Sequence, residues 1–193
     1  MKIIINKLLS TIMVACLALC AQAGVHVQNN QGDMNNNSKT LVAYFSATGT
    51  TMEAASRLAQ AANADLHEIV PEKQYTAADL NWNDKSSRSS VEMADKSSRP
   101  AIASRVENME QYDTVFVGFP IWWYIAPTII NTFLEQYDLA GKTIIPFFTS
   151  GGSGAGETLK YLKPSAPDAH WLNPKNLNYM SQSEMKAWVD SLK

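Results

Sequence analysis

Hydroxyl side chains crowd around one glycine in residues 46–51, directly after an apolar run. A helix that begins here offers free backbone N–H groups and a partial positive charge, and both attract phosphate. The glycine lets the backbone curl closely around an anion. No Gly-Lys-Ser/Thr follows, so this is not a Walker A loop. Such a cluster also occurs as a plain N-cap, but its position predicts a phosphate site formed by Ser46, Thr48, Gly49, Thr50 and Thr51.

Large aromatic side chains stand in a row in residues 120–124, after another apolar run. Three consecutive aromatic residues on one loop cannot all enter a single core. Aromatic faces stack on flat hydrophobic rings; the competing interpretation is that one Trp plugs the top of a sheet and another covers the next helix. We expect both to hold in part for this segment, which consists of Pro120, Ile121, Trp122, Trp123 and Tyr124.

A glycine-rich segment follows a third apolar run and precedes a predicted helix. Glycine allows backbone N–H groups to approach the edge of a ligand. A dinucleotide-binding fingerprint is the alternative, but the glycine spacing differs and the unit lies near the C-terminus. The segment therefore predicts a backbone rim built from Thr149, Ser150, Gly151, Gly152 and Gly154.

These loops need a framework that brings the ends of apolar runs together. Apolar runs predict strands at residues 41–45, 65–70, 114–119, 143–148 and 168–172. Helical spacing follows at residues 52–62, 127–137, 155–162 and 181–192, the last of which starts with a capping-box pattern. This alternation predicts an α/β fold with a doubly wound five-stranded parallel sheet of order 2-1-3-4-5 and helices on both faces. In that order, the first two loops border one crevice.

Two features depart from the regular pattern. Pro146 falls within the fourth strand, where proline removes a ladder hydrogen bond, so we expect a β-bulge there. Residues 71–100 are polar and contain Asp-Lys-Ser-Ser-Arg twice, at residues 84–88 and 95–99. Two copies are too few for a repeat architecture. We interpret the segment as a solvated loop or lid that replaces a crossover helix.

Together, the three loops resemble those of the flavodoxin family, in the branch with a Trp-Trp pair in the second loop. The resemblance covers roughly residues 40–192 and implies a flavodoxin-like fold, bound FMN and one- or two-electron transfer. It implies that the first loop holds the phosphate, the second lines the isoalloxazine and the third meets its rim. It also suggests that Tyr75 and Arg99 close over the site. Many relatives have His and Gly where this chain has Ser150 and Tyr124.

The first 23 residues are typical of a signal peptide rather than of a folded domain. Lys2 and Lys7 form a basic start, residues 8–19 are mostly apolar, and a small-x-small pattern ends at Ala23. Cleavage is therefore expected before Gly24, with export to the periplasm or the medium. The apolar stretch is too short to span a bilayer comfortably.

Lipoprotein processing at Cys16 or Cys20 is the alternative to simple secretion. Both cysteines lie within the signal, so the mature chain is expected to hold no disulfide and no thiolate chemistry. Residues 24–38 are rich in Asn, Gln, Gly and Ser and predict a flexible tether. Residues 39–193 then form the flavodoxin-like domain.

The leading functional hypothesis is an exported FMN electron carrier, with a redox partner protein or a small quinone-like acceptor. The alternatives are an FMN-dependent NAD(P)H:quinone or nitro-compound reductase and a non-redox binding protein on the same fold. A formal net charge of −2 gives no reason to expect nucleic acid or an anionic membrane as a partner. The histidines are scattered, so we expect no catalytic triad and no metal site. With no basic residue in the phosphate loop, we expect a reduction potential below that of free FMN.

Overall fold

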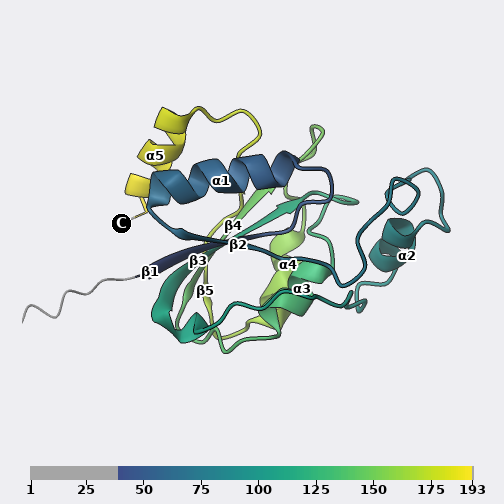
Figure 1. The fold of residues 1–193 in the computed structure, drawn as a ribbon, viewed down its shortest axis with the longest axis horizontal. Helices are drawn as coiled ribbons and strands as arrows, with labels where there is room; N and C mark the ends of the chain where they lie inside the picture. The colour runs from purple at the N-terminus through teal and green to yellow at the C-terminus, as the bar shows by residue number, and fades with distance from the viewer. Residues whose placement is uncertain (1–38, 193) are drawn as a thin grey trace, which may run out of the picture. The chain divides into compact units, whose positions relative to one another are not determined.

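The computed structural model describes residues 39–192; the predicted signal peptide and tether lie outside this range. A parallel sheet in the order β2-β1-β3-β4-β5 forms the centre, with a further strand, β6, beside β4 (Figure 1). The strands are β1 (Lys39–Tyr44), β2 (Asp65–Glu68), β3 (Tyr112–Pro120), β4 (Thr143–Thr149), β5 (His170–Trp171) and β6 (Lys175–Asn176). The predicted order is confirmed. The last predicted strand, at residues 168–172, contains the short β5, and β6 is a further strand that we did not predict.

Helices cover both faces of this sheet. They are α1 (Thr50–Ala62), α2 (Arg88–Ala94), α3 (Ile129–Leu134), α4 (Thr158–Leu162) and α5 (Gln182–Asp190), with 3₁₀ turns at Met109–Gln111 and Lys163–Ser165. Figure 1 shows α1 and α5 on one side and α3 and α4 on the other. Side chains alternate along β1, so Val42 packs with α1 and α5, whereas Leu41 and Ala43 pack with α3 and α4.

Helix α5 begins as its sequence predicts. The N–H of Glu184 donates to Ser181 Oγ, and the N–H of Ser181 donates to Glu184 Oε2 at 2.8 Å. This reciprocal pair satisfies donors that a helix start leaves free. Met185 and Val189 then face the sheet from the buried side of the helix.

Pro146 does not cause the expected bulge, because β3 and β4 pair without a register shift, with Pro146 opposite Val117. The carbonyls of Ile144 and Phe148 accept N–H groups from the opposite side, where β5 and β6 lie. Alternate residues of a strand direct their backbone polar groups to the same side, so the nitrogen of Pro146 also faces that side. It lies between the stretches of β4 that pair with β5 and β6. The proline thus coincides with the break between these strands and removes no bond to β3.

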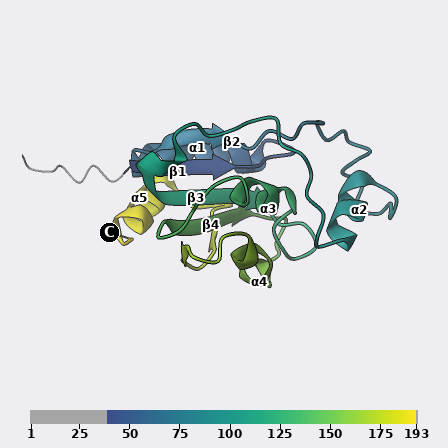
Figure 2. The same cartoon turned by 90° about the horizontal axis from the view of Figure 1, so that it is seen from below.

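The segment between β2 and β3 is a structured projection with a short helix, whereas we expected a solvated loop or lid. We call residues 70–104 the insert. Its base is clasped by backbone bonds from Glu72 to Ala101 and from Ala103 to Val70, at 2.9 and 2.8 Å. It carries the short helix α2, which lies beyond one end of the sheet in both views (Figure 2).

The near repeat within the insert forms the same turn twice. Asp84 accepts bonds from the N–H and the hydroxyl of Ser86, and Asp95 accepts the same two bonds from Ser97. Only the first copy leads into a helix, because Ser87 then caps α2.

Across residues 39–192, no helix has both the length and the apolar character needed to cross a bilayer. The same residues contain no group of three or more His, Cys, Asp or Glu side chains placed to hold a metal ion.

Candidate functional site

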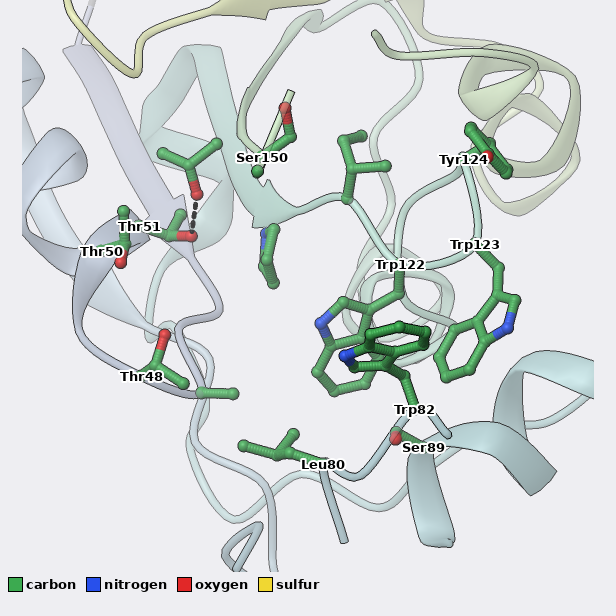
Figure 3. Close-up of a pocket in the computed structure, with 15 residues that line it drawn as sticks. Thr48, Thr50, Thr51, Leu80, Trp82, Ser89, Trp122, Trp123, Tyr124 and Ser150 are labelled. Carbon is green, nitrogen blue, oxygen red and sulfur yellow. Dashed lines mark hydrogen bonds between the residues drawn. The ribbon is translucent and has the colours of Figure 1, made fainter. Parts of the chain in front are cut away.

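A cavity of about 620 Å³ lies where β1, β3 and β4 end (Figure 3). The carboxyl ends of parallel strands meet at one edge of a sheet, where open α/β folds form their binding crevices. Most of the predicted site residues line this cavity: Thr48, Thr50, Thr51, Pro120, Ile121, Trp122, Trp123, Tyr124, Thr149, Ser150 and Gly151. Four others do not: Ser46, Gly49, Gly152 and Gly154.

In the first loop, Ser46 and Gly49 shape the backbone. The N–H of Gly49 donates to Ser46 Oγ at 3.1 Å, and Gly49 has a φ of 94°, in the left-handed region. The first helical bond of α1 runs from the N–H of Glu53 to the carbonyl of Gly49. The N–H groups of residues 50–52 precede that bond and have no partner within the helix, so they are suited to binding an anion.

Thr149 connects all three loops. Its Oγ1 lies 2.8 Å from Thr51 Oγ1 in a buried hydroxyl pair, which joins the third loop to the first (Figure 3). Its carbonyl accepts the N–H of Ile121 at 2.9 Å, which joins the third loop to the second. The three segments thus hold a fixed geometry around one cavity.

The second loop contains a tight turn with bulky residues at its centre. Trp122 and Ile125 exchange backbone hydrogen bonds of 2.9 and 3.1 Å. Trp123 and Tyr124 between them have φ values of 46° and 65°. Positive φ at both central positions is the type I′ pattern, which Asn and Gly usually occupy. Backbone strain of this kind clusters at functional sites.

The packing of Trp122 fits the structural interpretation of the aromatic row, whereas stacking of Trp123 and Tyr124 on a flat ring stays a prediction. The Trp122 ring packs edge-on against Phe45 at 5.6 Å, and Phe45 belongs to the core over β1. Trp123 and Tyr124 remain 41% and 71% exposed while lining the cavity. Figure 3 shows the Trp122 and Trp123 indoles across the cavity from Thr48, Thr50 and Thr51.

The third loop is held by a residue that the sequence did not reveal. The N–H of Ser150 donates to Asn178 Oδ1 at 2.9 Å, and Asn178 Nδ2 donates back to the carbonyl of Ser150. Asn178 follows β6, and only the folded chain brings it here. On the other side of the loop, a Cβ on Gly156 would lie 2.2 Å from the carbonyl oxygen of Tyr124. The backbone just after the third loop therefore lies directly against the strained turn.

The insert forms one wall of the cavity, but not through Tyr75 and Arg99, the residues that we expected there. Leu80, Trp82 and Ser89 line the cavity, as does Ala47 in the first loop. Trp82 is 71% exposed. Ser89 is 2% exposed, and its Oγ has no hydrogen-bond partner among the described residues. A buried hydroxyl left unpaired costs about 1–3 kcal/mol, so this atom is suited to a ligand.

Tyr75 and Arg99 do not close over the site, contrary to our expectation. The Tyr75 ring packs behind the aromatic row, with its centroid 5.6 Å from that of Phe45 and 5.4 Å from that of Trp122. Arg99 is drawn away by Glu135, at 2.8 Å, near the end of α3.

A polar cluster fixes Tyr75 and with it the insert. The Tyr75 hydroxyl donates to Glu92 Oε2 at 2.5 Å, and the Arg88 guanidinium lies 3.9 Å above the Tyr75 ring. Arg88 also forms an ion pair with Glu92 at 2.6 Å. Burial, together with the Glu92 carboxylate, raises the pKa of Tyr75. Tyr75 therefore remains a neutral donor and serves to anchor the insert.

The cavity as a whole suits a ligand with an anionic group at one end and a flat ring at the other. Hydroxyls and the start of α1 form the first end, and indoles form the second. None of the residues that line it is charged.

The family model for flavodoxin matches residues 39–192. The structure of a candidate flavoprotein from Bacteroides eggerthii is 54% identical, covers 80% of this chain and 98% of its own, and has a TM-score of 0.77. For one from Bacteroides uniformis these values are 53%, 79%, 98% and 0.76.

A flavoprotein in complex with FMN from Lactobacillus acidophilus is 23% identical, covers 78% of this chain and 98% of its own, and has a TM-score of 0.63. At that identity, the likeness is one of fold. No curated protein matches the chain. The family match over all of the described residues, together with relatives of more than half identity, shows that the chain belongs to the flavodoxin family.

Proposed function

We propose that this chain binds FMN in the cavity and acts in electron transfer. The observation that carries the proposal is the joining of three loops through Thr149, with an anion site at one end of the cavity and indoles at the other. The FMN complex of the Lactobacillus acidophilus relative supports it. Bound FMN supplies the one- or two-electron chemistry, whereas the protein binds, orients and tunes it.

Each end of the cavity has its own part in this proposal. The N–H groups at the start of α1 and the hydroxyls of Thr48 and Thr50 hold the phosphate. Trp123 and Tyr124 contact the flat ring, and the backbone of residues 150–151 meets its edge. A cavity without a charged lining disfavours added negative charge on the ring. We therefore expect a reduction potential below that of free FMN, which a redox titration measures.

The direct test is the absorption spectrum of the purified protein, followed by release and identification of the cofactor. We expect one FMN per chain and a higher melting temperature when FMN is added, because a ligand that binds only the folded state stabilises it. Thr50→Val should weaken binding, whereas Thr132→Val, on α3 outside the cavity, should not. A colourless protein that gains no stability from FMN is a non-redox binding protein, and the proposal fails.

A reductase is the second candidate, favoured by the exposed aromatic rim of Trp82, Trp123 and Tyr124 at the cavity. An enzyme needs access to the ring for NAD(P)H and then for a second substrate. Steady-state oxidation of NAD(P)H with a quinone or nitro compound separates the two functions. Turnover identifies a reductase, and an FMN-loaded protein without turnover is a carrier.

We further propose that the chain is exported and cleaved before Gly24. N-terminal sequencing of the protein from fractionated cells tests this. A soluble product that begins at Gly24 is expected, and Cys16→Ser and Cys20→Ser should leave it unchanged. A membrane-bound product that either substitution releases would identify a lipoprotein instead.

A further inference from the structure

We propose that the insert end of the cavity is a second binding site, for an uncharged planar aromatic compound that bears an oxygen acceptor. A naphthoquinone is the simplest example of this class. Leu80, Trp82 and Ser89 form the site. The inference rests on the proposed function in that FMN occupies the remainder of the same cavity.

Trp82 supplies an aromatic face with no packing role of its own. Its side chain is 71% exposed, although it is a large hydrophobic group on a segment that is otherwise anchored. Figure 3 shows its indole on the same side of the cavity as those of Trp122 and Trp123. Indole faces bind flat rings by offset or edge-on stacking. An exposed indole at the wall of a cavity is therefore suited to a planar ligand.

Ser89 supplies the polar contact. It is 2% exposed, and its hydroxyl has no partner among the described residues. Figure 3 places its side chain at the foot of Trp82. Its backbone is already committed, since its N–H donates to the carbonyl of Asp79 at 2.9 Å. The free hydroxyl thus remains to donate to a carbonyl or nitro oxygen of a ligand lying on Trp82.

The lining at this end carries no charge, which disfavours an ionic ligand. Arg88, next to Ser89 in sequence, is paired with Glu92 and also donates to the carbonyl of Lys73 at 2.6 Å. Asp79 is occupied by the backbone and hydroxyl of Thr76. A charged group brought into the uncharged lining would lose its hydration without gaining a partner.

The site is formed before any ligand arrives. Arg88 and Glu92 hold Tyr75, which packs against Trp122 and thereby attaches the insert to the second loop. The bond from Ser89 to Asp79 ties α2 to the turn that carries Leu80 and Trp82. A preorganised site of this kind avoids the entropic cost of ordering a loop on binding.

Three probes test the inference on the FMN-loaded, oxidised protein, with dissociation constants measured by ligand-observed NMR. They are 2-methyl-1,4-naphthoquinone, 2-methylnaphthalene, which lacks the acceptor, and 1,4-naphthoquinone-2-sulfonate, which is charged. We expect the neutral quinone to bind most tightly. Trp82→Ala should weaken the binding of the quinone and of the hydrocarbon alike, by about tenfold. Ser89→Ala should weaken the binding of the quinone only, by roughly threefold to tenfold.

Matched controls lie outside the cavity lining. Ser90→Ala removes a hydroxyl from the next position of α2, and Tyr179→Ala removes an aromatic ring that is 94% exposed. Neither should change the binding of any probe. The FMN absorbance per chain is measured for every variant.

The outcomes are distinct. A wild-type protein that binds no FMN refutes the proposed function. A wild-type protein that holds FMN but binds the sulfonate as tightly as the neutral quinone overturns the second site. Loss of FMN from Trp82→Ala also overturns it, because the insert would then belong to the cofactor site. Selective loss of quinone binding from Ser89→Ala, with FMN retained, supports it.

Discussion

Tyr124 joins three properties that seldom occur in one residue: a bulky side chain, a φ of 65° and 71% exposure. A left-handed conformation costs a residue with a Cβ about 1–3 kcal/mol. Little packing compensates for this cost at so exposed a position. Tyr124 lines the cavity, so we infer that the strain is retained for the ligand.

Tyr124→Gly should therefore separate stability from binding. We expect the free energy of unfolding of the apoprotein to rise by up to about 1 kcal/mol, because the relief of strain exceeds the added entropy of the unfolded chain. FMN affinity should fall, because the ring contact is lost. Urea unfolding and FMN titration measure the two effects. Tyr124→Ala is the matched control, since it removes the ring but keeps the strain. Equal stability of the two variants would contradict the prediction.

At the scale of elements, the packing between β3 and β4 depends on Gly118, which lies beneath the ring of Phe147. Gly118 is opposite Phe147 in the register, and a Cβ on Gly118 would lie 2.1 Å from the Phe147 ring. Phe147 is fully buried. The absence of a side chain at residue 118 thus gives the ring its place in the core between the sheet and α1.

Gly118→Ala should lower the free energy of unfolding by about 1–3 kcal/mol through overpacking. Phe147→Leu alone should also destabilise the protein, but in the double variant it makes room for the methyl group that Gly118→Ala adds. The double variant should be more stable than the sum of the single effects predicts, by roughly 0.5–3 kcal/mol. Denaturant unfolding in a double-mutant cycle tests this coupling. Strict additivity would show that the ring does not occupy the space above Gly118.

The insert is a second element whose order depends on a few contacts. Arg88→Met removes the ion pair with Glu92 and the cation–π contact with Tyr75 while keeping the aliphatic stem. We expect faster amide exchange in the insert, by mass spectrometry, and a larger loss of stability than for an exposed pair, because Arg88 and Glu92 are only 19% and 14% exposed and the Glu92 carboxylate would lose its cation. Lys160→Met, which breaks an exposed pair with Glu157 on α4, is the control. Unchanged exchange in the insert would refute the anchoring role of Arg88.

For the whole molecule, buried strands were the most predictable part. The runs at residues 41–45, 114–119 and 143–148 lie within β1, β3 and β4 or extend one residue beyond them, because a strand covered on both faces must be continuously apolar. Their order followed from the connection rules, and with it the meeting of three loops at one cavity. The binding roles of the predicted residues stay predictions.

The remainder depended on contacts between distant segments. Trp82 lies at the cavity because Tyr75 packs on Trp122 and so attaches the insert to the second loop. No local sequence pattern predicts that contact. The role of Asn178 arises in the same way, from its bonds to Ser150. The separate strand β6 had one signal, Pro146, which the sequence shows but which we interpreted as a bulge.

The acid stability of the whole fold should depend on His67 in β2. The ring stacks on Phe133 at 6.2 Å, its Nε2 has no partner among the described residues, and burial lowers the pKa of His67 from its usual 6.5. The unfolded chain therefore takes up the proton first as pH falls. The free energy of unfolding should decrease from about pH 6.5 downwards until the folded-state pKa is reached, by at most about 1.4 kcal/mol per pH unit.

Urea unfolding between pH 7.5 and 5 measures this slope. His67→Phe keeps a ring against Phe133 and cannot bind the proton, so it should flatten the pH dependence across this range. His170→Phe, at an exposed position on β5, is the control and should keep the wild-type slope. If His67→Phe kept that slope and His170→Phe lost it, the acid sensitivity would originate in β5 rather than in β2. That result would contradict the assignment of the acid sensitivity to His67, which is half-buried against Phe133, whereas His170 is exposed.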